Sequence, residues 1–216
     1  MPDGGERLYL ITDGSAKRET TRFLEKLDRA LSGGARLIQI REKDLSAREL
    51  LGLAKVVKKK AEKYGARILI NDRADIALVA GADGVHITGA GYAPFEARNI
   101  LGDKALIGVS THSIDEARRA EEEGADFVTF GPVYFTESKA AYGEPLGIEK
   151  LREATSAIKV PVYALGGVTK ERVKEAVSNG ASGVAVISAV FGSDDIEKSV
   201  KGFLEALYPN IQRGQR

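Results

Sequence analysis

Three polar side chains occupy alternating positions at the end of one apolar run: Gln39, Arg41 and Lys43. In an extended chain, residues two apart project to the same side. An amide, a guanidinium and an ammonium group can therefore face one ligand, and this set suits a phosphate or a diphosphate. The alternative interpretation is a surface ladder of ion pairs with the neighbouring acids Glu42 and Asp44.

Other apolar runs also end in residues that could carry chemistry. Asn71 and Asp72 follow one run and offer oxygen ligands to a hard cation such as Mg²⁺, although Asp72 could instead cap the next helix. His112 follows another run, and an imidazole can exchange protons near neutral pH. A single histidine in such a place is more often structural. The chain has only two histidines, His86 and His112, and both follow apolar runs, which favours function.

A long connection at 131–147 carries two hydroxyls and an ammonium group, from Thr136, Ser138 and Lys139. Connections of this length without secondary structure are often functional lids, and these side chains again suit a phosphate. A plain surface loop is the alternative interpretation.

The last two apolar runs end in Gly166-Gly167 and in Ser188. Glycines allow backbone N–H groups to approach an anion closely. The sequence therefore predicts two anion sites, one from the group around Arg41 and one from Gly167 and Ser188.

A repeated pattern predicts the elements that position these residues. Five times an amphipathic stretch ends in Gly-Ala, one variable residue and an apolar run, beginning at Gly34, Gly65, Gly81, Gly124 and Gly180. Glycine can end a helix in the left-handed conformation, and the apolar run is typical of a buried parallel strand. Apolar runs at 8–11, 105–109 and 160–165 bring the predicted strands to eight.

Eight strands that alternate with helices over 216 residues predict a single-domain (β/α)8 TIM barrel with short flexible ends at 1–6 and 209–216. An open doubly wound sheet is the alternative, and it is disfavoured because only one closing helix is expected after the eighth strand. Ser46 with Glu49, and Ser113 with Glu116, have the spacing of capping boxes. In such a barrel the chemistry lies at the carboxyl ends of the strands.

The composition limits the function further. The chain has 32 basic and 31 acidic residues, which favours neither nucleic acid nor a membrane surface as a partner. It has no cysteine, so it has no thiol nucleophile and no disulfide. No apolar run is long enough for a membrane span, and no signal peptide is recognisable. We therefore expect a cytoplasmic protein that acts on small phosphorylated substrates, with a homodimer as an open alternative.

The chain resembles the thiamine phosphate synthase superfamily, which includes the thiazole tautomerases. The resemblance extends over nearly the whole chain, and its motifs are Gln39–Lys43, Ile70–Asp72, Asp83–His86, Gly108–His112, Phe130–Val133, Thr136–Lys139 and Ala164–Val168. It implies a (β/α)8 barrel that joins hydroxymethylpyrimidine diphosphate to thiazole phosphate and releases pyrophosphate with Mg²⁺.

The resemblance also implies a role for each candidate residue. The pyrimidine and its diphosphate would be held by Gln39, Arg41, Lys43 and Asn71, and Mg²⁺ by Asp72. The departing pyrophosphate would contact Ser110 and Lys139. The thiazole phosphate would be surrounded by Thr136, Ser138, Gly167 and Ser188. The catalytic set is then Arg41, Lys43, Ser110, His112 and Lys139.

One departure from the synthase pattern leaves alternatives open. Synthases normally carry a second Mg²⁺-binding aspartate in the loop after the fourth strand, and Gly91 stands at that position here. The loop is more like that of the tautomerases, which move a proton on a thiazole carboxylate phosphate without Mg²⁺, with His112 as the acid/base. A regulatory barrel that only binds a thiamin intermediate is a third alternative. The retained set from Gln39 to Lys139 favours the synthase.

Overall fold

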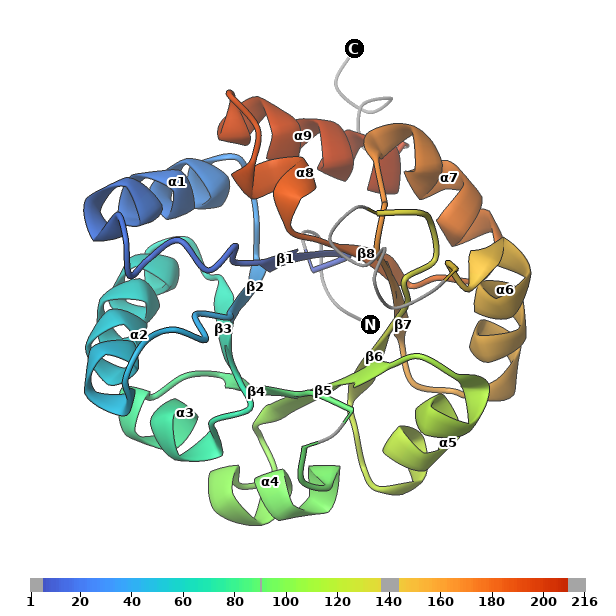
Figure 1. Cartoon of the computed structure of the whole chain (residues 1–216), viewed down its shortest axis with the longest axis horizontal. Coiled ribbons are helices and arrows are strands. Elements are labelled where there is room, and N and C mark those ends of the chain that lie inside the picture. Colours follow the sequence, from blue (N-terminus) through green and yellow to red (C-terminus); the bar gives the residue numbers. More distant parts are fainter. Residues whose placement is uncertain (1–5, 90, 137–143, 210–216) are drawn as a thin grey trace.

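Eight parallel strands close into one barrel, and the helices surround it (Figure 1). The computed structural model describes residues 6–89, 91–136 and 144–209. The strands are β1 (Leu8–Ile11), β2 (Leu37–Ile40), β3 (Arg67–Asn71), β4 (Gly84–Ile87), β5 (Leu106–Thr111), β6 (Phe127–Phe130), β7 (Val162–Leu165) and β8 (Gly183–Val186). Each strand pairs with the next, and β8 pairs with β1. The predicted TIM barrel is confirmed, and the open sheet is wrong.

The helices that the structure describes follow the strands in turn. They are α1 (Thr20–Ser32), α2 (Ala47–Glu62), α3 (Ala74–Ala80), α4 (Pro94–Leu101), α5 (Ile114–Glu122), α6 (Gly147–Ala157), α7 (Lys170–Ser178), α8 (Ser188–Phe191) and α9 (Ile196–Leu207). The expectation of one closing helix was wrong, because the short α8 precedes α9. Among the described residues, no helix has both the length and the apolar character that a membrane crossing requires.

The Gly-Ala repeat ends helices as predicted. The glycine of all five repeats has a positive φ, and Gly81 is a left-handed C-cap of α3 with φ 66°. Ser46 forms the predicted capping box with Glu49 at the start of α2. The second capping box was wrong in part: Ser113 accepts a hydrogen bond from the N–H of Glu116, but the Glu116 carboxylate accepts from the N–H of His112 instead.

The inside of the barrel is filled by a small cluster that is separate from the larger core beneath the helices. Three of its side chains are aromatic and meet edge to face: the centroids of the Tyr9 and Phe127 rings are 5.3 Å apart, as are those of Phe127 and Tyr163. The barrel is therefore a packed core and leaves only its rim for chemistry.

Gly108 of β5 makes room for this interior packing. A Cβ at this position would lie 2.3 Å from Cζ of Phe127 and 2.6 Å from Nδ1 of His86. Both neighbours are buried, so neither can move away into solvent.

We predict that Gly108→Ala lowers the free energy of unfolding by about 1–3 kcal/mol, because the extra methyl group overpacks the barrel. Gly52→Ala is the matched control: Gly52 lies within α2 and its added Cβ would meet nothing within 4 Å. This control should gain about 0.5–1 kcal/mol from helix propensity. Urea unfolding measures both, and an equal effect of the two substitutions would contradict the overpacking argument.

Candidate functional site

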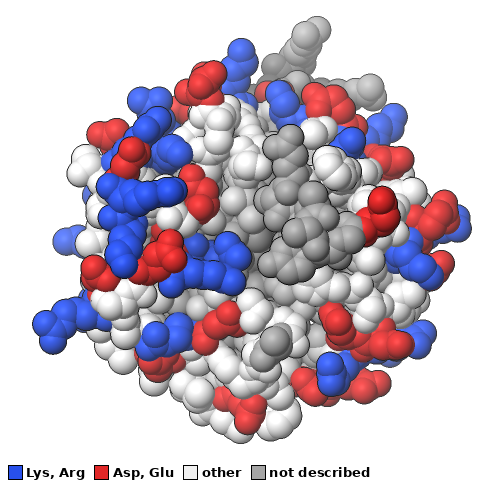
Figure 2. Space-filling model, viewed as in Figure 1, with Lys and Arg blue, Asp and Glu red and all other residues white. Residues whose placement is uncertain are grey.

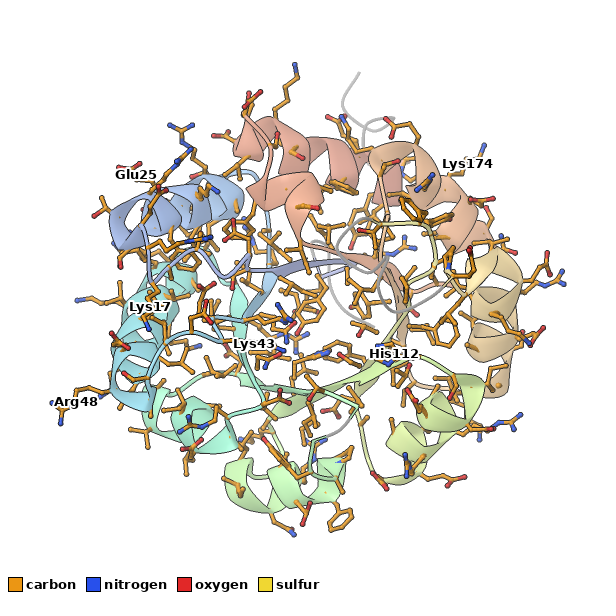
Figure 3. The ribbon with its side chains drawn as sticks, viewed as in Figure 1. Lys17, Glu25, Lys43, Arg48, His112 and Lys174 are labelled. Atoms are coloured by element: carbon orange, nitrogen blue, oxygen red, sulfur yellow. The ribbon has the colours of Figure 1, made fainter. Side chains whose placement is uncertain are left out.

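The polar residues singled out in the sequence lie around one end of the barrel. Because the eight strands are parallel and closed, their carboxyl ends surround a single mouth. Figure 3 shows Lys43 and His112 inside the ring of helices, whereas Glu25, Arg48 and Lys174 lie on its outer side. The predicted site residues that the structure describes therefore share one rim.

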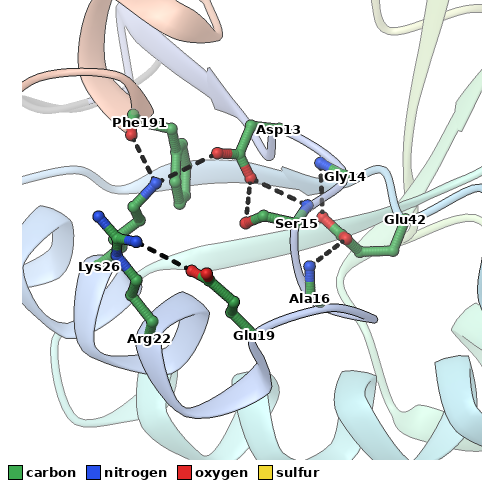
Figure 4. Close-up of polar contacts among 9 residues, drawn as sticks. All are labelled: Asp13, Gly14, Ser15, Ala16, Glu19, Arg22, Lys26, Glu42 and Phe191. Carbon is green, nitrogen blue, oxygen red and sulfur yellow. Dashed lines mark hydrogen bonds and ion pairs between the residues drawn. The ribbon is translucent and has the colours of Figure 1, made fainter.

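The segment after β2 divides its side chains between the mouth and the protein behind it. Glu42 is 5% exposed, and its carboxylate accepts hydrogen bonds from the N–H groups of Gly14 (3.1 Å) and Ala16 (2.9 Å) in the loop between β1 and α1 (Figure 4). Burial raises the pKa of Glu42. The alternative ion-pair ladder is therefore wrong, because this acid holds a loop and leaves Arg41 and Lys43 without it.

Arg41 and Lys43 are therefore available to a ligand. Neither forms an ion pair with any carboxylate of the described residues. The N–H of Arg41 donates to Oγ1 of the buried Thr12 (2.8 Å), which fixes the backbone from which the guanidinium projects. Figure 2 shows basic side chains near the middle of this face, over the loop between β2 and α2. This is a concentration of positive charge suited to an anion.

A chain of hydrogen bonds connects β2 to β3 at the mouth. Gln39 is 2% exposed, and its Nε2 donates to Oδ1 of Asn71 (2.9 Å). Nδ2 of Asn71 then donates to Oδ2 of Asp72 (2.9 Å). These amides orient each other and the carboxylate, so at least one polar group of each side chain is already engaged within the protein.

Asp72 has an unusual backbone that turns its carboxylate toward β4. Its φ is 55°, in the left-handed region that residues other than glycine seldom adopt. The N–H of Thr88 donates to Oδ1 (2.7 Å) and Oγ1 of Thr88 to Oδ2 (3.1 Å). Arg73 is the N-cap residue of α3, so the helix-capping role considered for Asp72 is wrong. Strained backbone held by several contacts is typical of functional sites.

Gly91 borders this carboxylate. A Cβ at Gly91 would lie 3.4 Å from Oδ1 of Asp72 and 2.6 Å from Cγ2 of Ile87. A side chain at position 91, where the resemblance implies a second acid, would thus lie beside Asp72. No group of three or more His, Cys, Asp or Glu side chains that could hold a metal ion occurs among the described residues.

Ser110 of β5 meets His86, which was not predicted as a site residue. His86 of β4 is 1% exposed, and its Nε2 lies 2.9 Å from Oγ of Ser110. Burial, together with the charge of Arg41, lowers the pKa of His86 to about 3. A signal was present in the sequence, because a histidine inside an apolar strand needs a polar partner. Thr12 and Thr88 were also not predicted as site residues.

His112 lies just beyond β5 in a different environment. Its side chain is 49% exposed, and Nδ1 lies 3.3 Å from Oε2 of Glu116 on α5. An exposed imidazole beside a carboxylate can accept and return a proton. The two histidines of the chain therefore have separate partners.

The second predicted anion group has a packing role that the sequence did not reveal. A Cβ at Gly167 would lie 2.4 Å from the carbonyl oxygen of Phe135. The N–H of Tyr134 donates to the carbonyl of Gly166 (3.0 Å). Glycine thus lets the loop after β6 lie against the loop after β7.

The remaining candidates of this group divide between described and undescribed residues. Thr136 lies in the loop after β6, and the exposed Ser188 opens α8. Ser138 and Lys139 lie outside the described residues.

The buried histidine predicts a pH dependence of stability. Folded His86 stays neutral until the pH approaches its pKa of about 3, whereas the unfolded chain takes up this proton near the ordinary value of 6.5. Between these values the unfolded state binds more protons, so stability is complete above pH 6.5 and is lost as the pH falls. The loss approaches about 1.4 kcal/mol per pH unit. Urea unfolding from pH 7 to pH 4 should show a steeper loss for the wild type than for His86→Gln, and parallel curves would contradict it.

Comparisons with known proteins agree with this arrangement. The family model described as thiamine monophosphate synthase matches residues 8–190. A protein of Geobacter sulfurreducens named putative thiamine-phosphate synthase is 50% identical over 205 residues, which cover 95% of this chain and 96% of that protein. A thiamine-phosphate synthase of Clostridium novyi is 44% identical over 196 residues, covering 90% and 95%.

Solved structures give the same result. The thiamine phosphate pyrophosphorylase from Pyrococcus furiosus superposes with a TM-score of 0.85 at 34% identity, covering 96% of this chain and 98% of that one. A 3-hexulose-6-phosphate synthase superposes with a TM-score of 0.72 at 20% identity, covering 93% and 99%, and this likeness shows the fold alone.

Proposed function

Because the chain belongs to the thiamine monophosphate synthase family, we propose that it joins hydroxymethylpyrimidine diphosphate to thiazole phosphate at this mouth and releases pyrophosphate. The observation that carries the proposal is the pair of cations after β2, which form no ion pair within the described residues and share the rim with Ser110. A bound diphosphate would be the anionic partner that these two cations do not have among the described residues.

The proposed mechanism is a substitution at the methylene carbon of the pyrimidine. The bond from this carbon to the diphosphate oxygen breaks, and its electron pair leaves with the oxygen. The pyrimidine amino group stabilises the resulting cation, and the thiazole nitrogen then forms the new C–N bond. Arg41, Lys43 and Ser110 present donors where negative charge grows on the leaving oxygens, so they lower the barrier.

The second substrate would occupy the other side of the same mouth. We assign its phosphate to Thr136, Gly167 and Ser188 together with Ser138, and assign Lys139 to the departing pyrophosphate. Gln39 and Asn71 would meet the pyrimidine. Holding both substrates in one mouth adds proximity to the electrostatic effect.

The acidic residue at the mouth fits a magnesium ion that is shared with substrate. Both carboxylate oxygens of Asp72 accept hydrogen bonds, one on Oδ1 and two on Oδ2, so Oδ1 keeps a lone pair for a ligand. Mg²⁺ is commonly held by one or two carboxylates together with substrate phosphates. Asp72 would hold it here, and the ion would supply further positive charge to the leaving diphosphate.

His112 and Glu116 support a second candidate activity, proton transfer on a thiazole carboxylate phosphate. The exposed pair could serve as acid and base at the rim. The relatives named as synthases favour the coupling reaction. If the chain were a tautomerase, His112→Ala would abolish turnover of the carboxylate substrate, whereas the coupling reaction does not require this imidazole as a base. A regulatory barrel without catalysis would show no turnover in either assay.

The first test is the two-substrate coupling assay over a magnesium titration. We expect thiamine phosphate and pyrophosphate in equal amounts, with a rate that rises with magnesium. Arg41→Ala should lower kcat/KM by an amount equivalent to about 2–5 kcal/mol, because it removes a cation from a phosphate partner. Arg22→Ala is the control, since Arg22 pairs with Glu19 on the exposed surface of α1. Absence of product at every magnesium concentration would refute the proposal.

A second test uses the position beside Asp72. Gly91→Asp places a second carboxylate there, and a unit charge about 4 Å from an ion contributes about 1–4 kcal/mol. We therefore expect the magnesium concentration at half-maximal rate to fall roughly tenfold. Gly91→Asn is the control, because it meets the same contact with Ile87 without the charge. Equal magnesium dependence in both variants would contradict the assignment of Asp72.

A further inference from the structure

The His86 ring lies inside the barrel and has one hydrogen-bond partner among the described residues, Ser110. Its ring packs against Tyr9 (centroids 5.5 Å apart) and Phe127 (5.8 Å), and its Nε2 meets Oγ of Ser110 at 2.9 Å. Nδ1 is buried and has no hydrogen-bond partner among the described residues. Nε2 therefore has a hydrogen-bond partner, whereas Nδ1 has none among the described residues.

This difference selects one tautomer of the imidazole. A neutral imidazole carries one N–H. If it were on Nδ1, a buried donor would have no acceptor among the described residues, and orphaned buried N–H groups are rarer than unfilled acceptors. If it is on Nε2, the N–H has an acceptor in Ser110. The imidazolium form is excluded near neutral pH, because burial lowers the pKa of His86 to about 3.

The tautomer sets the direction of the Ser110 hydroxyl. A serine hydroxyl has one hydrogen and two lone pairs. When Oγ accepts from His86, its own hydrogen is free to point to another partner. Ser110 is partly exposed near the carboxyl end of β5, so that hydrogen can serve the mouth. With the other tautomer, the hydroxyl would donate inward to Nε2 and turn lone pairs toward the mouth, where they would repel an anion.

We propose that His86 is a positioning residue that, as an Nε2–H donor, makes the Ser110 hydroxyl a hydrogen-bond donor to an anion at the mouth. This inference rests on the proposed function, which assigns Ser110 to a diphosphate. His86 itself does not touch the ligand. It acts through Ser110, and its role is separate from that of the exposed His112.

Nuclear magnetic resonance tests the tautomer without any substrate. The chain has only two histidines, so ¹⁵N-histidine labelling gives two rings, and His112→Gln assigns them. In a long-range ¹H–¹⁵N spectrum at neutral pH, we expect a protonated Nε2 and an unprotonated Nδ1 for His86. A protonated Nδ1 with a bare Nε2 would overturn the proposal.

Calorimetric titration with inorganic pyrophosphate tests the consequence. We expect His86→Leu to weaken binding roughly ten- to hundredfold, the effect of one hydrogen bond to a charged group, and His86→Gln to restore much of it. In the Ser110→Ala background, His86→Leu should have no further effect. Additive losses would show that His86 does not act through Ser110 and would overturn the proposal.

The two proposals fail in different ways. The spectrum and the titration involve no turnover, so they remain informative if the coupling assay yields no product. A His86→Leu protein that does not fold leaves the wild-type spectrum as the deciding measurement. Normal coupling activity together with the opposite tautomer would overturn this inference alone.

Discussion

The interior of the barrel must be filled by side chains from all eight strands, and the rest of the site depends on how this is done. The rings of Tyr9, Phe127 and Tyr163 meet edge to face, and His86 packs against the first two. Gly108 allows this by having no side chain. Since the interior is close-packed, these rings form a rigid layer beneath the mouth of the barrel. These rings set the position of His86, whose Nε2 meets Oγ of Ser110.

A nearly neutral chain can still leave positive charge unpaired at the mouth, because its acids and bases there have different partners. The Glu42 carboxylate accepts hydrogen bonds from two backbone N–H groups of a neighbouring loop. The Asp72 carboxylate accepts three hydrogen bonds, from Asn71 and Thr88. Buried carboxylates need such donors. Arg41 and Lys43 have no carboxylate partner among the described residues, so the local excess is positive. The overall balance of 32 basic and 31 acidic residues does not reveal this.

The features that were predictable from the sequence are those set by short-range periodicity. The Gly-Ala repeat identified five helix ends with positive φ, and the apolar runs identified the eight strands. Contacts between distant segments were not predictable. Glu42 reaches Gly14 across 28 positions, and His86 reaches Ser110 across 24. Nothing in local propensity specifies such pairs, because the barrel geometry creates them.

One local pattern can also lose to another local contact. Ser113 and Glu116 have the spacing of a capping box, yet the Glu116 carboxylate accepts from the N–H of His112 and lies near its ring. The same residue type then has two roles in this chain. His112 is half exposed beside a carboxylate, and His86 is enclosed by aromatic rings beside a hydroxyl. Burial removes the charged state of His86 near neutral pH and leaves a fixed N–H donor, whereas the His112 ring stays open to solvent.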